Sequence, residues 1–352
     1  MRKGPERREP DGPSVGPRWA LPLLALVGAL GVVLVVVALV GRNDAPESGL
    51  GITEPSAPSA ERPARPLLRW APPPLSSPTT LHLGDGFNEV ELDEGSDYVI
   101  ELPRRRTRGG VVLKGGHNVV VKGGRIVIPA DADEDAERTG VYVKDATGTV
   151  HLEGIRIEAE GAGDGVVVNA PKAVVQIENL RVDGIRGSFA GFHADVVQPW
   201  GGARELRIDR LTGTSDYQGL QIPVDLQPIG STTVRHANMR FAGGEVGGGF
   251  LIWLTTGDDS CRSYPITLSE VYVRPKPGRS FDQAVWPSPG SDLPCAADIR
   301  DGRARWPALP VRGEVREGVP PDGDFVPRGV AGAGYVSPGY CPATGGGSSC
   351  AP

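Results

Sequence analysis

The residues best suited to chemistry lie between Gly191 and Pro223, where a short polar pattern occurs twice. The first copy is Asp195-Val-Val-Gln198 and the second is Gln218-Gly-Leu-Gln221. Amides, carboxylates and aromatic rings together suit the hydroxyl groups and apolar faces of a sugar. The candidate catalytic residues are Asp195, His193, Asp216 and Asp164. The candidate substrate-binding residues are Gln198, Trp200, Gln218, Gln221, Tyr142, Tyr217 and Arg204.

The carboxylates of this stretch are compatible with glycoside hydrolysis. A retaining hydrolase holds its two carboxyl groups about 5–5.5 Å apart, and an inverting one about 6.5–9.5 Å apart. Asp195 with Asp164 or Asp216 can meet either distance if neighbouring strands stack. His193 is a candidate general base, although a histidine beside a turn is more often structural. Two alternatives stay open, namely sugar binding without catalysis and a solvated amide ladder without a ligand.

The elements that must position these residues are short strands. From residue 81 to 275 the chain consists of β-branched runs separated by glycine-rich turns, with no apolar spacing typical of a helix. Two lines of apolar segments recur in it. In three successive turns the step between them is 11 residues, namely Val141 to Leu152, Val166 to Ile177 and Val197 to Ile208. A repeat of about 25–30 residues made only of strands predicts a parallel β-helix. A β-sandwich, the alternative, would not predict the constant step.

This register predicts which side chains point outward, because side chains alternate along a strand. The predicted inward column is Val141, Val166, Val197, Leu220 and Phe250. The predicted outward column is Tyr142, Val167, Gln198, Gln221 and Leu251. Asp195 and Gln218 then join the two glutamines in one outward patch over two adjacent turns. His236 falls in the other apolar line and is expected to be packed.

The segment GGHNVVVKGGRIVI (residues 115–128) and the repeat around it resemble the pectate-lyase-like right-handed parallel β-helix superfamily. The resemblance covers residues 81–275 and implies the fold more specifically than the function. It implies an extended sugar chain bound on an outward patch. For the lyases it also implies β-elimination, with a Lys or Arg base and a cation beside the uronate of the substrate. Arg204 and Arg207 are near in sequence, and no multi-aspartate calcium cluster lies in the stretch.

Composition excludes two broad classes of protein. Of 352 residues, 50 are glycine and 34 are proline, and both types break helices. The formal net charge is −6 with mixed signs, whereas a nucleic-acid-binding protein needs a basic face. We therefore expect an all-β protein that does not bind nucleic acid.

The N-terminal part predicts a membrane anchor followed by a spacer. A basic tail, residues 1–19, precedes residues 20–41, in which 21 residues from Ala20 to Val40 carry no charge. At about 1.5 Å per residue this run spans about 31 Å, enough to cross a bilayer core. The basic flank predicts a cytoplasmic N-terminus and an extracellular remainder, with a cleaved signal peptide as the alternative. Residues 42–80 contain nine prolines and predict a semi-extended linker.

Residues 276–352 are expected to form an irregular C-terminal cap, because the repeat gives way there to Pro-Gly segments. The four cysteines lie in the last hundred residues without CxxC spacing, which favours disulfides over zinc. The pairing nearest in sequence is Cys261–Cys295 and Cys341–Cys350, although four cysteines allow three pairings.

No cofactor is predicted, with one alternative. Asp131, Asp133 and Asp135 alternate in the way that calcium ligands can. The segment lacks the glycine and the closing glutamate of a calcium loop, so a solvated acidic turn is the simpler interpretation.

Overall fold

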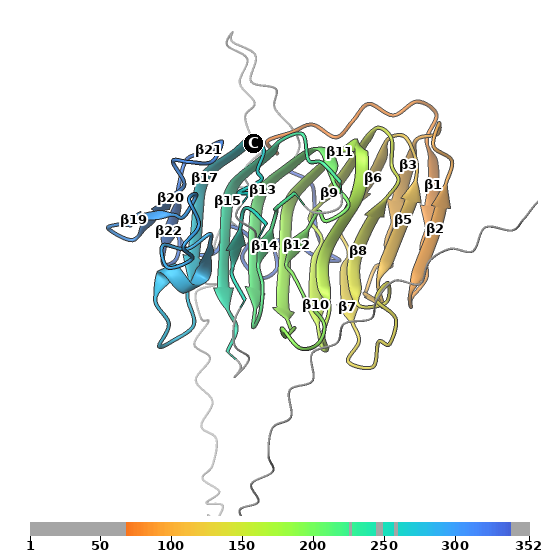
Figure 1. Cartoon of the computed structure of the whole chain (residues 1–352). Helices are drawn as coiled ribbons and strands as arrows, with labels where there is room; N and C mark the ends of the chain where they lie inside the picture. Colours follow the sequence, from red (N-terminus) through yellow and green to blue (C-terminus); the bar gives the residue numbers. More distant parts are fainter. Residues whose placement is uncertain (1–67, 225–226, 244–248, 257–259, 339–352) are drawn as a thin grey trace, which may run out of the picture. The chain divides into compact units, whose positions relative to one another are not determined.

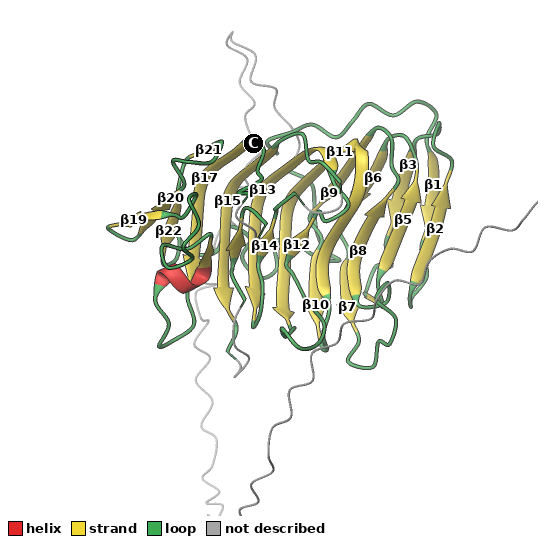
Figure 2. Ribbon diagram, viewed as in Figure 1, coloured by secondary structure: helices red, strands yellow, loops and turns green. Residues whose placement is uncertain are grey.

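The computed structural model describes residues 68–338 except 225–226, 244–248 and 257–259. These residues form an all-β protein with a long, mostly parallel sheet and one short helical turn, η1 (Phe281–Ala284). The strands stack in chain order, from β1 (Thr79–His82) at one end to β17 (Ile266–Arg274) and the strands after it at the other (Figure 1, Figure 2). This arrangement is compatible with a parallel β-helix.

Three parallel ladders build the fold, and ladder 1 holds the polar pattern. Each strand of ladder 1 pairs in parallel with the next. Its strands are β2 (Asn88–Leu92), β5 (Val111–Gly115), β8 (Thr139–Lys144), the start of β11 (Asp164–Ile185), β12 (Val197–Gln198), β14 (Leu220–Gln221), β16 (Ile252–Trp253) and β18 (Val285–Trp286).

Ladders 2 and 3 follow ladder 1 in each turn of the chain. Ladder 2 consists of β1, β3 (Tyr98–Glu101), β6 (Val119–Lys122), β9 (Thr149–Glu153), the middle of β11, the first parts of β13 (Ala203–Ser215), β15 (Thr232–Phe241) and β17, and β21 (Val311–Arg312). Ladder 3 consists of β4 (Thr107–Arg108), β7 (Arg125–Ile128), β10 (Arg156–Ala159), the ends of β11, β13, β15 and β17, and β22 (Val315–Glu317). The strands β19 (Asp298–Arg300) and β20 (Arg303–Arg305) add an antiparallel edge beside β22.

The register of ladder 1 confirms most of the predicted inward column. Val141, Val166, Val197 and Leu220 align in turn and are buried. The prediction of Phe250 is wrong, because Ile252 pairs with Leu220. Phe250 precedes the strand, and its ring contacts Trp253 and Trp286.

The prediction that Leu251 points outward is also wrong. Leu251 is fully buried, and Trp253 is the residue that aligns with Gln221. Phe250 and Ile252 have the same parity, so alternation alone could not distinguish the two registers. The chain enters this strand two residues later than the glycine pattern suggested.

One residue with positive φ forms the corner between ladders 2 and 3 in successive turns. The corner residues are Gly123, Gly154, Asn179, Arg210, His236, Glu270 and Gly313, with φ between 47° and 98°. His236 is therefore a corner residue with a 24% exposed side chain, whose ring packs against Phe325, and Val234 takes the place in the apolar line that was predicted for it. His236 lies 2.6 Å from Asp209 and 3.5 Å from Glu270. The left-handed conformation bends the chain sharply, at about 1–2 kcal/mol for a residue with a Cβ.

A segment that we call the N-terminal strap, residues 68–78, covers part of the outer face of ladder 2. Leu68 is buried, and the amides of Arg69 and Trp70 donate to the buried Glu178 carboxylate at 3.1 and 2.6 Å. The chain then enters β1, which pairs with β3. The described chain is thus already packed at Leu68, inside the stretch predicted as a linker.

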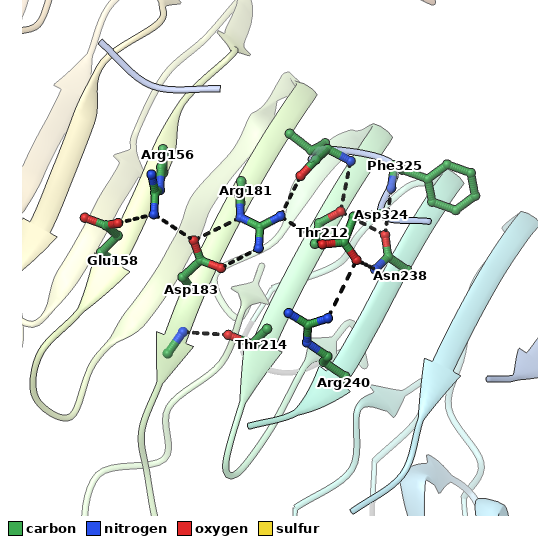
Figure 3. A network of polar contacts seen from close by, with 12 residues as sticks. Arg156, Glu158, Arg181, Asp183, Thr212, Thr214, Asn238, Arg240, Asp324 and Phe325 are labelled. Atoms are coloured by element: carbon green, nitrogen blue, oxygen red, sulfur yellow. Dashed lines mark hydrogen bonds and ion pairs between the residues drawn. The ribbon is translucent and has the colours of Figure 1, made fainter. Parts of the chain in front are cut away.

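The parallel ladders continue beyond residue 275 through β18, β21 and β22. A segment that we call the C-terminal strap, residues 320–338, then runs back over the outer face of ladder 3. There Asp324 accepts from Arg181 at 3.0 Å and from Asn238 at 2.9 Å (Figure 3). Farther along, the hydroxyl of Tyr335 donates to Glu153 at 2.7 Å.

The structure confirms the Cys261–Cys295 disulfide, whereas Cys341 and Cys350 lie outside the described residues. The predicted anchor, residues 20–41, also lies outside them. Within the described part of the chain, no helix has the length and apolarity that a membrane span requires.

Candidate functional site

The two straps cover parts of ladders 2 and 3, and several of the candidate residues lie on or beside the outer face of ladder 1. Successive strands there align Tyr142 with Val167 and Val167 with Gln198. The side-chain amides of Gln198 and of Gln221 on the next strand lie 2.7 Å apart, and Gln221 aligns with Trp253. The last member is Trp286, which aligns with Trp253. We call this series the outer row.

A pocket of about 480 Å³ opens beside the first half of the outer row. Five of the predicted site residues line it, and five further residues complete it. The predicted ones are Tyr142, Asp164, His193, Gln198 and Trp200, and the others are Asp135, Ala136, Thr139, Val167 and Phe192. Residues from four separate stretches of the chain thus meet in one cavity.

A buried pair of carboxylic acids, Asp164 and Asp195, lies at the pocket. Asp164 is 5% exposed and lines the cavity, whereas Asp195 is fully buried and does not line it. The backbone amide of Asp195 donates to Asp164 Oδ1 at 2.7 Å, which fixes the two residues on adjacent turns. This contact requires the stacking of β11 on the segment before β12, so the fold itself creates the pair.

Burial dominates the electrostatics of this pair. It raises the pKa of Asp164 from 3.8 to about 7, and the charge of Asp135 adds to the effect, whereas the Asp195 amide opposes it. Burial raises the pKa of Asp195 well above its ordinary value, and the neighbouring Asp164 charge adds to that effect. Two neighbouring carboxyl groups cannot both ionise easily in a medium of low polarity. The pair therefore retains at least one proton near neutral pH.

The side-chain amide of Gln221 lies against Asp195, and a second amide, that of Gln218, is also buried. In the orientation that satisfies its neighbours, the Gln221 side-chain nitrogen donates to Asp195 Oδ2 at 2.8 Å. Gln218 is 3% exposed, and its Oε1 has no hydrogen-bond partner among the described residues. Neutral amides stabilise a carboxyl group by hydrogen bonding without supplying a positive charge. The amides therefore leave the two carboxyl groups without a compensating positive charge, in agreement with the raised pKa values of Asp164 and Asp195.

Aromatic rings form the walls of the pocket. The ring centroids of Tyr142 and Trp200 are 6.4 Å apart, and those of His193 and Tyr217 are 5.7 Å apart. His193 is exposed, and its Nε2 lies 3.0 Å from the Phe189 carbonyl oxygen. Tyr217 is buried behind the pocket. The arrangement resembles a small-molecule site, in which apolar walls surround a few polar groups.

Six of the eleven sequence-based candidates do not line the pocket, namely Asp195, Gln218, Gln221, Tyr217, Asp216 and Arg204. Asp216 accepts a hydrogen bond from the Gly187 amide at 3.0 Å and holds a turn. Arg204 is exposed at the start of β13, on ladder 2. The second acid beside Asp195 is therefore Asp164 and not Asp216.

Sequence reasoning missed the contribution of the segment around Asp135. The sequence predicts a solvated acidic turn there, with a calcium site as the alternative, yet Asp135 lines the pocket and its charge acts on Asp164. Asp131 is exposed and lies 3.8 Å from Arg108. Within the described ranges, no group of three or more His, Cys, Asp or Glu side chains is arranged to hold a metal ion. The position of the loop between β7 and β8 could not be predicted from the sequence, because its ends carry no strand-pairing pattern.

Comparison with known proteins gives no match for this chain. No family model fits the sequence, and no curated protein or solved structure is significantly similar. The function must therefore be inferred from the site itself.

Proposed function

We propose that this protein is a membrane-anchored, extracellular, right-handed parallel β-helix of the pectate-lyase-like kind that binds a polysaccharide and hydrolyses it at the Asp164 pocket. The observation that supports hydrolysis is the Asp164–Asp195 pair, in which a carboxyl group with a pKa of about 7 faces an aromatic-walled cavity. Strongly shifted pKa values beside a cavity are typical of catalytic groups.

The proposed mechanism uses Asp164 as the general acid. A carboxyl group with a pKa near 7 is protonated at and below neutral pH and can donate its proton to a glycosidic oxygen. Asp195 acts as a positioning residue, because it lies behind Asp164 and its amide holds Asp164 Oδ1. Asp135, which lines the same cavity, acts as the general base that activates a water molecule.

Two observations bear on the alternatives to hydrolysis, which are β-elimination and binding without catalysis. The lining residues include no Lys or Arg, so the pocket offers no cationic base or uronate partner for β-elimination. The amides and aromatic rings, by contrast, do not need Asp164 in order to bind sugars. A non-catalytic binding module is therefore the second candidate.

A panel of polysaccharides tests the proposal with the full-length protein. Release of new reducing ends indicates hydrolysis, and an unsaturated product indicates elimination. Asp164→Asn should abolish release and retain binding. Asp216→Asn is the matched control, because this acid is near in sequence but does not line the pocket. Binding without release in the parent protein would favour the binding module, and elimination products would contradict the mechanism.

The proposed anchor needs a separate test. We expect the full chain to remain with membranes on alkaline extraction, and a variant that lacks residues 20–41 to be released. Release of the full chain by alkali would contradict the anchor.

A further inference from the structure

Three aromatic side chains form a platform at the far end of the outer row. The ring centroids of Phe250 and Trp286 are 5.1 Å apart, those of Phe250 and Trp253 are 5.5 Å apart, and those of the two tryptophans are 5.9 Å apart. All three residues are half-buried, so part of each remains accessible. We call this group the aromatic platform.

The platform is continuous with the pocket along one row of aligned residues. Gln198 borders the pocket, Gln221 follows on the next strand, and Trp253 and Trp286 follow on the two after that. Parallel strands are about 4.8 Å apart, so the row extends about 14 Å from Gln198 to Trp286. A ligand that occupied both ends would be an extended chain of several rings.

The charges along this row select against an acidic ligand. The row itself consists of neutral side chains, and the pocket is lined by two acidic residues, Asp135 and Asp164, and by no Lys or Arg. A uronate or sulfate group would meet these acidic side chains without a Lys or Arg partner among the lining residues. A neutral sugar instead presents apolar C–H faces to aromatic rings, whose faces are electron-rich, and hydroxyls to the amides.

We infer that the substrate is a neutral polysaccharide whose chain runs along the outer row, with the aromatic platform as a distal subsite for its sugar rings. This inference rests on the proposed function, because it assigns the substrate class of the same site. It departs from the acidic substrates that the resemblance to pectate lyases would suggest.

The test compares neutral and uronic-acid polysaccharides in binding and hydrolysis assays with the full-length protein. The variants are Trp253→Ala and Trp286→Ala, with Trp253→Phe as the conservative replacement. Trp70→Ala is the matched control, because Trp70 is a half-buried tryptophan of the N-terminal strap on ladder 2. Oligosaccharides of two lengths show whether the platform acts only on chains that reach it.

The expected result is a preference for the neutral polysaccharides. Each Trp→Ala change should weaken binding of long chains about 10- to 100-fold, leave short chains unaffected and leave kcat nearly unchanged. Trp253→Phe should restore most of the affinity, and Trp70→Ala should bind as the parent does. This length dependence would not follow from a structural defect.

Two results would overturn the inference. If the parent hydrolysed an acidic chain in preference and the platform variants bound normally, the substrate class would be wrong while the proposed function remained. If the parent neither bound nor cleaved any polysaccharide of either class, the proposed function and the inference would fail together.

Discussion

Buried ionisable side chains have opposite surroundings on the outer faces of ladders 1 and 3. On ladder 3, the Arg181 side chain is 1% exposed and is fully paired, with Asp183 at 2.9 Å, Asp324 at 3.0 Å and the Val326 carbonyl oxygen at 2.7 Å (Figure 3). On ladder 1, Asp164 and Asp195 are buried as well, yet the charge that acts on the pKa of each comes from another acid.

This difference separates a structural network from a candidate site. A buried cation with complete partners ties the C-terminal strap to the coil and has little freedom to react. Two buried acids without a cation keep a proton that they can donate, and they do so beside an open cavity. The strap occupies part of the outer face of ladder 3, whereas the pocket leaves the face of ladder 1 accessible.

The largest expected effect concerns turnover. Asp164→Asn removes the proposed proton donor and should lower kcat about 10²- to 10⁴-fold, because general acid catalysis contributes a factor of that size. Measurement of reducing-end release checks this result. The folded state should be at least as stable as that of the parent, because the change removes a buried acid. Unchanged kcat would exclude Asp164 as the acid.

Arg181→Leu should produce the largest loss of stability. The change leaves the carboxylates of Asp183 and Asp324 without their main partner, and breaking a buried ion pair from one side costs about 3–5 kcal/mol. Urea unfolding gives the free energy. A loss below about 1 kcal/mol would show that the network is not essential for stability.

The free energy of unfolding should depend on pH through Asp164. Because the pKa of Asp164 rises from 3.8 to about 7 on folding, the folded state binds more protons than the unfolded chain between those pH values. Stability from this group is therefore present below about pH 4 and is lost as the pH rises through about 7. Relative to the parent, Asp164→Asn should gain on the order of 4 kcal/mol over that interval.

Urea unfolding at several pH values measures this difference. Glu178→Gln is the control, because burial also raises the pKa of Glu178 to about 7 but this residue binds the N-terminal strap. A difference between Asp164→Asn and the parent that stayed constant with pH would contradict the raised pKa.

The smallest effect is expected at an exposed ion pair. Arg108 lies 2.7 Å from Glu160, and their side chains are 40% and 46% exposed. Such pairs contribute about 0–1 kcal/mol, so Arg108→Leu should barely change the urea midpoint. A loss comparable to that of Arg181→Leu would mean that burial does not distinguish these ion pairs.

Much of the fold could be predicted from the sequence, because stacked strands repeat the same inward pattern. The 11-residue step correctly aligned Val141, Val166 and Val197. It failed at Phe250, where a longer connection shifts the strand by an even number of residues and preserves the alternation. The corner residues could not be predicted from the sequence, because Asn179, Arg210 and His236 share a backbone conformation but no side-chain type.

The candidate site could be predicted only where its residues belong to strands. Gln198 and Gln221 were placed correctly because they follow inward apolar residues. Asp135 lies in a loop, and loop positions do not follow from strand periodicity. The straps were missed because proline-rich segments carry no pairing pattern, although Leu68 packs against the folded part.

The central claim is that the Asp164–Asp195 pair retains at least one proton at neutral pH. Carbon NMR of selectively labelled aspartate carboxyl groups, recorded between about pH 3 and pH 9, tests it directly against the ordinary Asp value of about 3.9. We predict one carboxyl signal that titrates near pH 7 in the parent and disappears in Asp164→Asn. Titration of every aspartate below about pH 5 would contradict the account.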